Sequence, residues 1–117
     1  MEQVTLPWVR IPPYPPSVTA VMDCKQIQTA ANLYSEIIQA RGLKAVRRSD
    51  QAIATDDEAL EHCLWMCERI AEMVEDRPSN KSDDRDREKA MRWTCFVQGV
   101  LWKVGLRSVK EMRDDNR

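Results

Sequence analysis

The stretch "TDDEALEHCLWMCERIAEMV", residues 55–74, carries the clearest structural pattern in the chain. Thr55 is followed three residues later by Glu58, which is the pattern of a helix-starting capping box, and the two intervening acids suit the positive end of a helix. Apolar residues then recur at spacings of three and four, which predicts a helix over about residues 55–76. Its core-facing stripe is Leu60, Cys63, Leu64, Cys67, Ile70, Ala71 and Val74.

The region after this helix predicts a turn and two more helices. Pro78 and the polar residues up to 84 are typical of a loop. Residues 85–104 repeat the helical apolar spacing, and Gly105 is placed to end that helix. Ser108 and Glu111 form a second capping box, which predicts a short helix over residues 109–115. The stripe of the longer helix is Ala90, Trp93, Val97, Val100, Leu101 and Val104.

The region before residue 55 predicts one further helix, over residues 24–41, with Gly42 as its stop. Residues 43–54 are apolar only at scattered positions and remain unassigned. The fold expected is therefore all-α: a three-helix domain spanning residues 22–117 with a short C-terminal helix. We expect the second and third helices to form an antiparallel hairpin, with the first packed across it.

The N-terminal residues 1–21 form a separate, proline-rich segment. Pro12, Pro13, Pro15 and Pro16 lack amide donors and restrict the residues before them, so this segment is expected to be extended. Its tetrapeptide "VRIP" is what the codons GTT-CGA-ATC-CC would encode, and that nucleotide sequence is similar to the TΨC arm of a transfer RNA gene. One hypothesis is that residues 1–21 are a read-through extension from an integration site. The alternative is a proline-rich arm that binds a partner or covers apolar surface.

Composition limits the class of protein. The chain has 117 residues, of which 43% are hydrophobic, and a formal net charge of −1. This length suits a single domain, and the charge gives no broad positive field for nucleic acid or membrane. No apolar run approaches the ~20 residues of a membrane span, and the N-terminus lacks the pattern of a secretion signal. Four cysteines are most simply reduced thiols, so we expect a cytoplasmic protein.

The second and third predicted helices carry more apolar residues than one interior face of a three-helix domain requires. We expect the surplus either to be covered by the N-terminal segment or to contact another chain, with a symmetric homodimer as the favoured arrangement. Aromatic side chains dominate interface energies, so they are the leading contact candidates. The protein-interface candidates are Trp65, Met66, Met73, Phe96 and Trp102.

A metal centre or a catalytic centre is not expected. Cys63 and Cys67 share a helix face, and Cys95 could approach them, but structural zinc ligands usually come from loops with two-residue spacings. His62 is the only histidine, and the adjacent Cys63 points to a different part of the helix surface. A nucleophile–base pair is therefore not indicated, and we expect a non-catalytic protein without a cofactor.

Two other functions remain open. A glycine-containing turn between two helices is typical of DNA-binding helix-turn-helix units, although acids interleave with the basic residues of the last helix. The nucleic-acid candidates of this alternative are Arg47, Arg48, Lys103, Arg107, Lys110, Arg113 and Arg117. The other alternative is a helical oligomer that holds a nucleotide messenger between its subunits.

The last quarter of the chain resembles a group of short, uncharacterised phage and prophage proteins. The resemblance rests on Trp93-x-x-Phe96-Val97-Gln98-Gly99, Leu101, Gly105, Ser108 and the final Asn116-Arg117, while Cys95 stands where glycine is expected. The group has no known activity, so the resemblance implies a prophage or mobile-element origin in a bacterial host rather than a reaction. Gln98-Gly99 inside a helix is expected to mark a close helix–helix approach. The function expected is a helical interaction protein that binds a host or defence protein.

Overall fold

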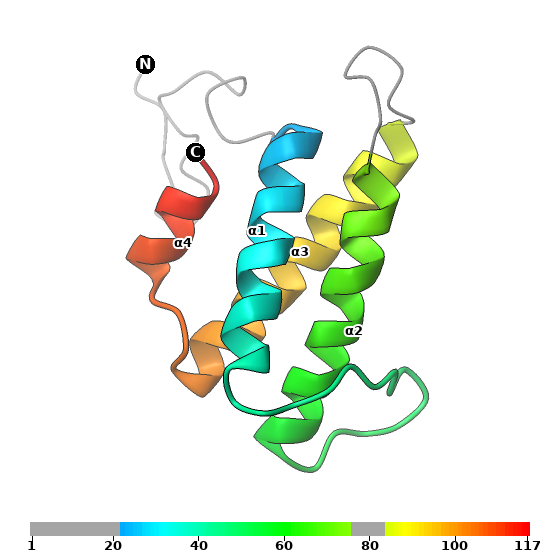
Figure 1. Cartoon of the computed structure of the whole chain (residues 1–117), viewed down its shortest axis with the longest axis vertical. Coiled ribbons are helices and arrows are strands. Elements are labelled where there is room, and N and C mark those ends of the chain that lie inside the picture. The colour runs from blue at the N-terminus through cyan, green and yellow to red at the C-terminus, as the bar shows by residue number, and fades with distance from the viewer. Residues whose placement is uncertain (1–21, 76–83) are drawn as a thin grey trace, which may run out of the picture.

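The computed structural model describes residues 22–75 and 84–117, and the regular structure of these two ranges is entirely helical. Its helices are α1 (Cys24–Gln39), α2 (Asp56–Val74), α3 (Asp84–Val104) and α4 (Val109–Asp115). The all-α fold with three main helices and a short C-terminal one is therefore confirmed (Figure 1). The proline-rich segment 1–21 and the expected stop at Pro78 lie outside the described residues.

The three long helices run alternately up and down, with α3 behind α1 and α2 in this view (Figure 1). α2 packs extensively on both α1 and α3, whereas α1 and α3 meet over a smaller area. The antiparallel hairpin of α2 and α3 is as expected. α1 packs mainly alongside α2, and α4 returns beside α1 so that the C-terminus lies near the end of the molecule where α1 begins (Figure 1).

Local sequence signals set the helix starts. Asp23 forms a full capping box with Gln26, in which each backbone N–H donates to the other side chain at 2.8 Å. Ser108 and Glu111 form the second complete box, at the start of α4. Thr55 accepts a hydrogen bond from the backbone N–H of Glu58, which begins α2. These bonds satisfy amide donors that have no partner inside the helix.

Two glycines with positive φ end helices as expected. Gly42 has φ of 79° and follows the last turn of α1, while Gly105 has φ of 87°. At the end of α3 the N–H of Leu106 donates to the carbonyl of Leu101 at 2.8 Å, and that of Gly105 donates to the carbonyl of Trp102 at 3.1 Å. This pair of bonds is a Schellman motif, which requires the left-handed conformation at Gly105.

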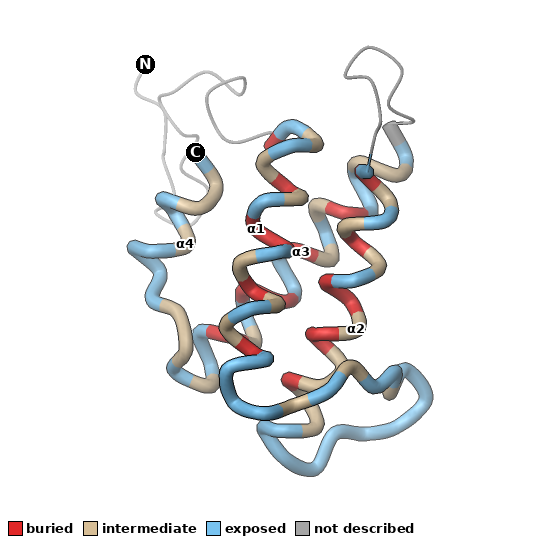
Figure 2. The backbone as a smooth tube through the Cα atoms, viewed as in Figure 1, coloured by how far each residue is buried: buried red, intermediate tan, exposed pale blue. Residues whose placement is uncertain are grey.

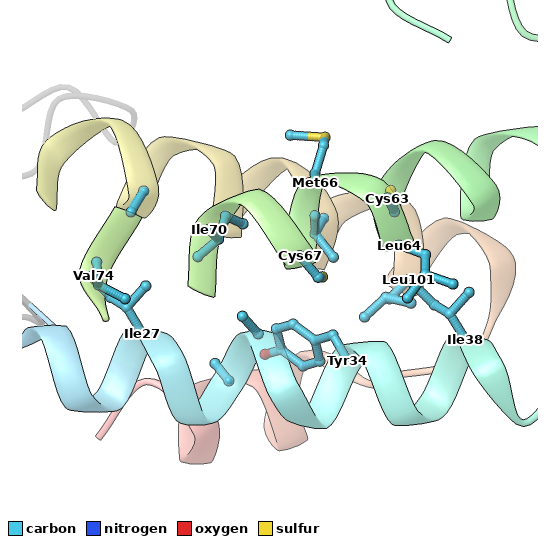
Figure 3. Close-up of a cluster of buried hydrophobic side chains, with 14 of the residues drawn as sticks. Ile27, Tyr34, Ile38, Cys63, Leu64, Met66, Cys67, Ile70, Val74 and Leu101 are labelled. Atoms are coloured by element: carbon cyan, nitrogen blue, oxygen red, sulfur yellow. The ribbon is translucent and has the colours of Figure 1, made fainter. Parts of the chain in front are cut away.

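The core lies between α1, α2 and α3, where the predicted apolar stripes face one another (Figures 2 and 3). Tyr34 of α1 points from its helix toward Cys67 of α2, and Ile38 lies near Leu64 and Leu101 (Figure 3). Burial of these side chains supplies most of the driving force for folding. The largest completely buried side chains are Tyr34, Ile27, Ile38, Leu60, Leu64, Ile70 and Leu101.

The connection over residues 40–55 includes residues 43–54, which the sequence left unassigned. It contains no regular structure but is bonded to α2. The N–H of Val46 donates to the carbonyl of Glu61 at 3.1 Å, and the N–H of Arg48 donates to Nδ1 of His62 at 3.0 Å. The guanidinium of Arg48 also pairs with Glu61 at 2.7 Å and with Glu58 at 3.4 Å. This connection is therefore held in place and can form one wall of a surface feature.

A buried polar network attaches α4 to the rest of the fold. Gln98 of α3 donates through Nε2 to the hydroxyl of Tyr34 at 2.8 Å and to Oδ1 of Asn116 at 2.7 Å. The Tyr34 hydroxyl in turn donates to Oδ2 of Asp115 at 2.7 Å, and Arg107 donates to the same carboxylate through Nε at 3.0 Å. α4 has no buried residue of its own, so polar contacts rather than apolar burial position it.

Candidate functional site

The outward side of α3 carries an exposed apolar surface, which we call the outer face and define as Cys95, Phe96, Gly99, Trp102 and Lys103. Among the described residues, Phe96 and Trp102 are the most exposed large apolar side chains, at 55% and 59%. Both rings belong to one helix and lie three residues before and three residues after Gly99. Three residues turn a helix by about 300°, so the rings flank Gly99 on opposite sides.

An open groove of about 460 Å³ runs along one side of the outer face. One wall is α3 over residues 95–104, and the other is the segment 53–56 together with Ala59. Ile53, 41% exposed, and Val100 make the lining largely apolar, while Lys103 and Asp56 place one charge of each sign on opposite walls. A groove of this kind accepts an apolar side chain more readily than a phosphate group, which requires several converging donors.

Gly99 faces away from the bundle. A Cβ atom placed on it would meet no atom within 4 Å, so no part of the described fold approaches it closely. The expectation that Gln98-Gly99 marks a close helix–helix approach is therefore wrong within a single chain. Gln98 is indeed buried, at 7% exposure, but it makes hydrogen bonds rather than a backbone-to-backbone contact.

The five interface candidates occupy three different environments. Phe96 and Trp102 are exposed, Trp65 and Met73 are half-buried against the core, and Met66 is buried at 6% exposure. Met66 lies three residues after Cys63 and four before Ile70, on the side of α2 that faces the core. It belongs to the core, which corrects the expectation that it lies on a binding surface.

Trp65 is covered by side chains of its own chain. The His62 ring stacks on it with centroids 5.5 Å apart, and Trp93 of α3 lies tilted beside it at 5.9 Å. The guanidinium groups of Arg47 and Arg69 lie 5.3 Å and 5.9 Å from its ring centroid. The Trp65–Trp93 contact lies between α2 and α3, and the two cation–π contacts cover the Trp65 ring from the connection and from α2 itself. Phe96 and Trp102 are therefore the better anchors for a second molecule.

Two of the thiols, Cys63 and Cys67, and the histidine are in surroundings that suppress their chemistry. Burial raises the pKa of Cys63 to about 12 and that of Cys67 to about 12, so both remain protonated at neutral pH. Burial and the nearby charge of Arg47 lower the pKa of His62, and its Nδ1 already accepts the N–H of Arg48. Cys95 lies on the outer face, apart from these buried thiols. Among the described residues, no three histidine, cysteine or acidic side chains are placed to hold a metal ion.

The basic candidates for DNA binding are dispersed and partly paired. Arg48 is bonded to Glu58 and Glu61 on α2, and Arg107 is bonded to Asp115 and Glu111. The connection before α2 and helix α4 lie on opposite sides of the view in Figure 1. Five candidates remain outside these ion-pair clusters or at their edge: Arg47 over Trp65, Lys103 beside the groove, exposed Lys110 and Arg113, and Arg117 near Asp114. The structure does not bring the seven together into one basic surface.

The groove wall formed by Ile53 and its neighbours was missed from the sequence. Residues 43–54 show no periodicity, and their position is set by contacts to α2 that no local pattern encodes. The network around Gln98 was also missed, although Gln98 and Asn116 both belong to the motif that resembles phage proteins.

Comparison with models of protein families, with curated proteins and with solved structures finds no match to this chain. None of the described helices is both long enough and apolar enough to span a membrane. The outer face is therefore the feature of the described fold that bears on function.

Proposed function

We propose that this protein is a non-catalytic helical binding module that engages another protein through the outer face of α3. The observation that carries the proposal is the pair of exposed rings, Phe96 and Trp102, beside an open apolar groove. Exposed aromatic residues next to a hollow are the usual anchors of protein interfaces. One wall of the groove is a regular helix, which favours recognition of a folded or helical partner with little rearrangement of α3.

The resemblance of the last quarter to phage proteins supports a mobile-element origin, with a host or defence protein as the partner. Most of the motif positions have a role inside the chain. Val97 and Leu101 are core residues, and Gln98 bonds to Asn116. Phe96 and Gly99 have no comparable contact in the described fold, which fits residues that serve an external partner.

The assignment as non-catalytic is supported by what the reactive groups are already doing. His62 stacks on Trp65 and accepts a backbone hydrogen bond, while Cys63 and Cys67 are protonated core residues. A general base or nucleophile needs a free lone pair directed at a substrate, and the outer face offers none from these residues.

The test is site-specific photo-crosslinking in lysate of a bacterial host. Benzoylphenylalanine replaces Phe96 or Trp102, which keeps an aromatic ring at each position. The matched control carries the same group at Val109, a 47% exposed apolar residue on α4. We expect a discrete protein adduct from positions 96 and 102 and none from 109.

Other outcomes of this experiment contradict the proposal. An adduct pattern shared by all three positions indicates nonspecific stickiness, and no protein adduct at any position overturns the binding function. The DNA-binding alternative predicts instead that nucleic acid co-purifies at low salt, is lost at high salt, and is reduced by Lys110→Glu with Arg113→Glu.

A further inference from the structure

Gly99 is a destabilising residue for its position, and no contact within residues 22–75 and 84–117 explains it. It lies within a helix of 21 residues, where glycine is destabilising relative to alanine. Because a Cβ at this position would meet no atom within 4 Å, alanine would fit the isolated fold. No described part of the fold therefore requires the missing side chain, whereas a second molecule that packs closely on α3 would require it.

The surface around Gly99 has the shape of a shallow saddle. Phe96 and Trp102 project on either side of the glycine, and more than half of each side chain is exposed. A helix placed between the two rings could approach the backbone of α3 closely, which is the packing that glycine permits. The groove lies on the Phe96 side of this saddle.

We propose that the outer face of α3 is covered by the same face of a second copy, with the two α3 helices antiparallel and crossing at Gly99. The inference rests on the proposed function, because it names the chain that covers the same face in the free protein. A host protein then binds by displacing the second copy.

The geometry of the face is self-complementary in this arrangement. In an antiparallel two-fold pair, a residue three positions before the crossing point lies opposite residues three or four positions after it in the partner. Phe96 then lies over the groove of the other copy, where Val100 and Lys103 form the wall. Each copy inserts one ring and receives one, while Trp102 lies opposite Cys95 of the other copy.

The charges around the face permit such self-association. Lys89, Arg92 and Lys103 are exposed on α3, and Glu88 and Asp56 are exposed beside them, so both signs are present on this side of the molecule. An interface between identical surfaces repeats its charge on both sides, and a face of one sign would therefore repel its copy. The positive Lys103 also approaches the inserted Phe96 ring, which is a favourable cation–π arrangement.

The size of the face predicts a weak dimer. α3 has 21 residues, which makes it about 30 Å long, and its face with the groove wall offers on the order of 500 Å² per copy. A standard stable interface buries about 800 Å² per partner, so the dissociation constant is expected to be micromolar or weaker. A tighter host partner can therefore replace the second copy by mass action.

The first test is sedimentation of the purified full chain under reducing conditions, from about 1 to 500 µM, a range that brackets a micromolar constant. We expect the mass to rise from 13.6 kDa toward twice that value. Gly99→Leu and Phe96→Asp are each expected to weaken association at least roughly tenfold, and the control Val109→Asp to leave it within about twofold. Thermal unfolding by circular dichroism checks that Gly99→Leu is not less stable than the wild type.

A monomer throughout this concentration range, or an unchanged dissociation constant in folded Gly99→Leu, overturns the proposal.

The orientation of the two helices is tested by mild oxidation of the wild-type dimer. In the antiparallel pair the two Cys95 residues are about 12 Å apart along the helices, which is too far for a disulfide. Rapid Cys95–Cys95 crosslinking at dimer concentrations overturns the antiparallel crossing, and its absence supports it.

The two proposals fail separately. A purified chain that stays monomeric while position 96 crosslinks to a host protein overturns the dimer and leaves the binding function intact. A purified dimer that gives only self-adducts in lysate supports the dimer and overturns the host-binding function.

Discussion

Gln98 and Gly99 are neighbours in the sequence but lie on sides of α3 with opposite properties. Gln98 is 7% exposed, and its amide donates both to Tyr34 at 2.8 Å and to Asn116 at 2.7 Å. Gly99 is exposed, and a side chain there would touch nothing. The inner side of the helix is bonded to its own chain, whereas at Gly99 the outer side meets no other part of the described fold. Stability and association should therefore respond to different residues of one helix.

Thiol reactivity gives the largest expected contrast between the two sides. Cys95 is exposed, whereas burial raises the pKa of Cys63 and Cys67 to about 12. At pH 8 a thiol with such a pKa is a thiolate in about one molecule in 10,000, and burial also blocks the reagent. Under native conditions we expect an alkylating reagent to label Cys95 at least roughly a thousandfold faster than Cys63 or Cys67.

Peptide mapping by mass spectrometry measures these rates. Denatured protein is the control, since all four thiols should then react at similar rates. Comparable labelling of Cys67 and Cys95 in the native protein would show that the core between α1 and α2 opens readily, and the contrast between the two sides would not hold.

Truncation of adjacent side chains gives the next largest effect. Leu101 is completely buried and Trp102 is 59% exposed, although they are consecutive. Leu101→Ala should lower the free energy of unfolding by about 2–5 kcal/mol, because it removes buried apolar contacts and leaves a cavity. Trp102→Ala should change it by less than about 1 kcal/mol.

Urea unfolding followed by circular dichroism, at a concentration where the chain is monomeric, checks this pair. A loss in Trp102→Ala as large as that in Leu101→Ala would show that the Trp102 ring packs against its own chain, and it would remove the main anchor of the outer face.

The buried polar network should give an intermediate effect. Gln98→Ala removes two hydrogen bonds and leaves the Asn116 carbonyl oxygen without its side-chain donor, which should cost about 2 kcal/mol in unfolding free energy. Tyr34→Phe removes the hydroxyl that connects Gln98 with Asp115. Because both variants act on one network, the double variant should cost less than the sum of the two. Strict additivity in a double-mutant cycle would mean that the two bonds stabilise α4 independently.

The parts of the structure that sequence could predict are those with local causes. The α4 limits, Val109–Asp115, follow from a capping box, and the ends of α1 and α3 follow from Gly42 and Gly105. A cap involves residues three apart, and an apolar stripe repeats within two turns, so both are readable without knowledge of the fold.

The remaining features depend on residues distant in the chain. Gln98 meets Tyr34 across 64 positions, and Tyr34 meets Asp115 across 81. The groove needs Ile53 to lie beside residues 95–104 of α3, which are more than forty positions further along the chain. The surplus of aromatic residues on α2 and α3 could be predicted from the sequence. Which of their rings are covered by other side chains could not. Trp65 is covered by Arg47 and His62, and no spacing rule distinguishes it from Trp102.

The smallest expected effect is that of Gly99→Ala on the free energy of unfolding. Whether this change is positive or negative distinguishes between the explanations of the glycine. Gly99→Ala should raise the free energy of unfolding of the monomer by about 0.5–1 kcal/mol, because alanine reduces the freedom of the unfolded chain and its Cβ meets no atom. Gly105→Ala is the matched control, since φ of 87° strains any side chain and should lower stability instead. Thermal or urea unfolding at low protein concentration measures both. If Gly99→Ala is destabilising, some part of the chain already occupies the outer face and the second copy is not needed to explain the glycine. If it is stabilising while self-association weakens, Gly99 serves the contact between copies at a cost to the fold.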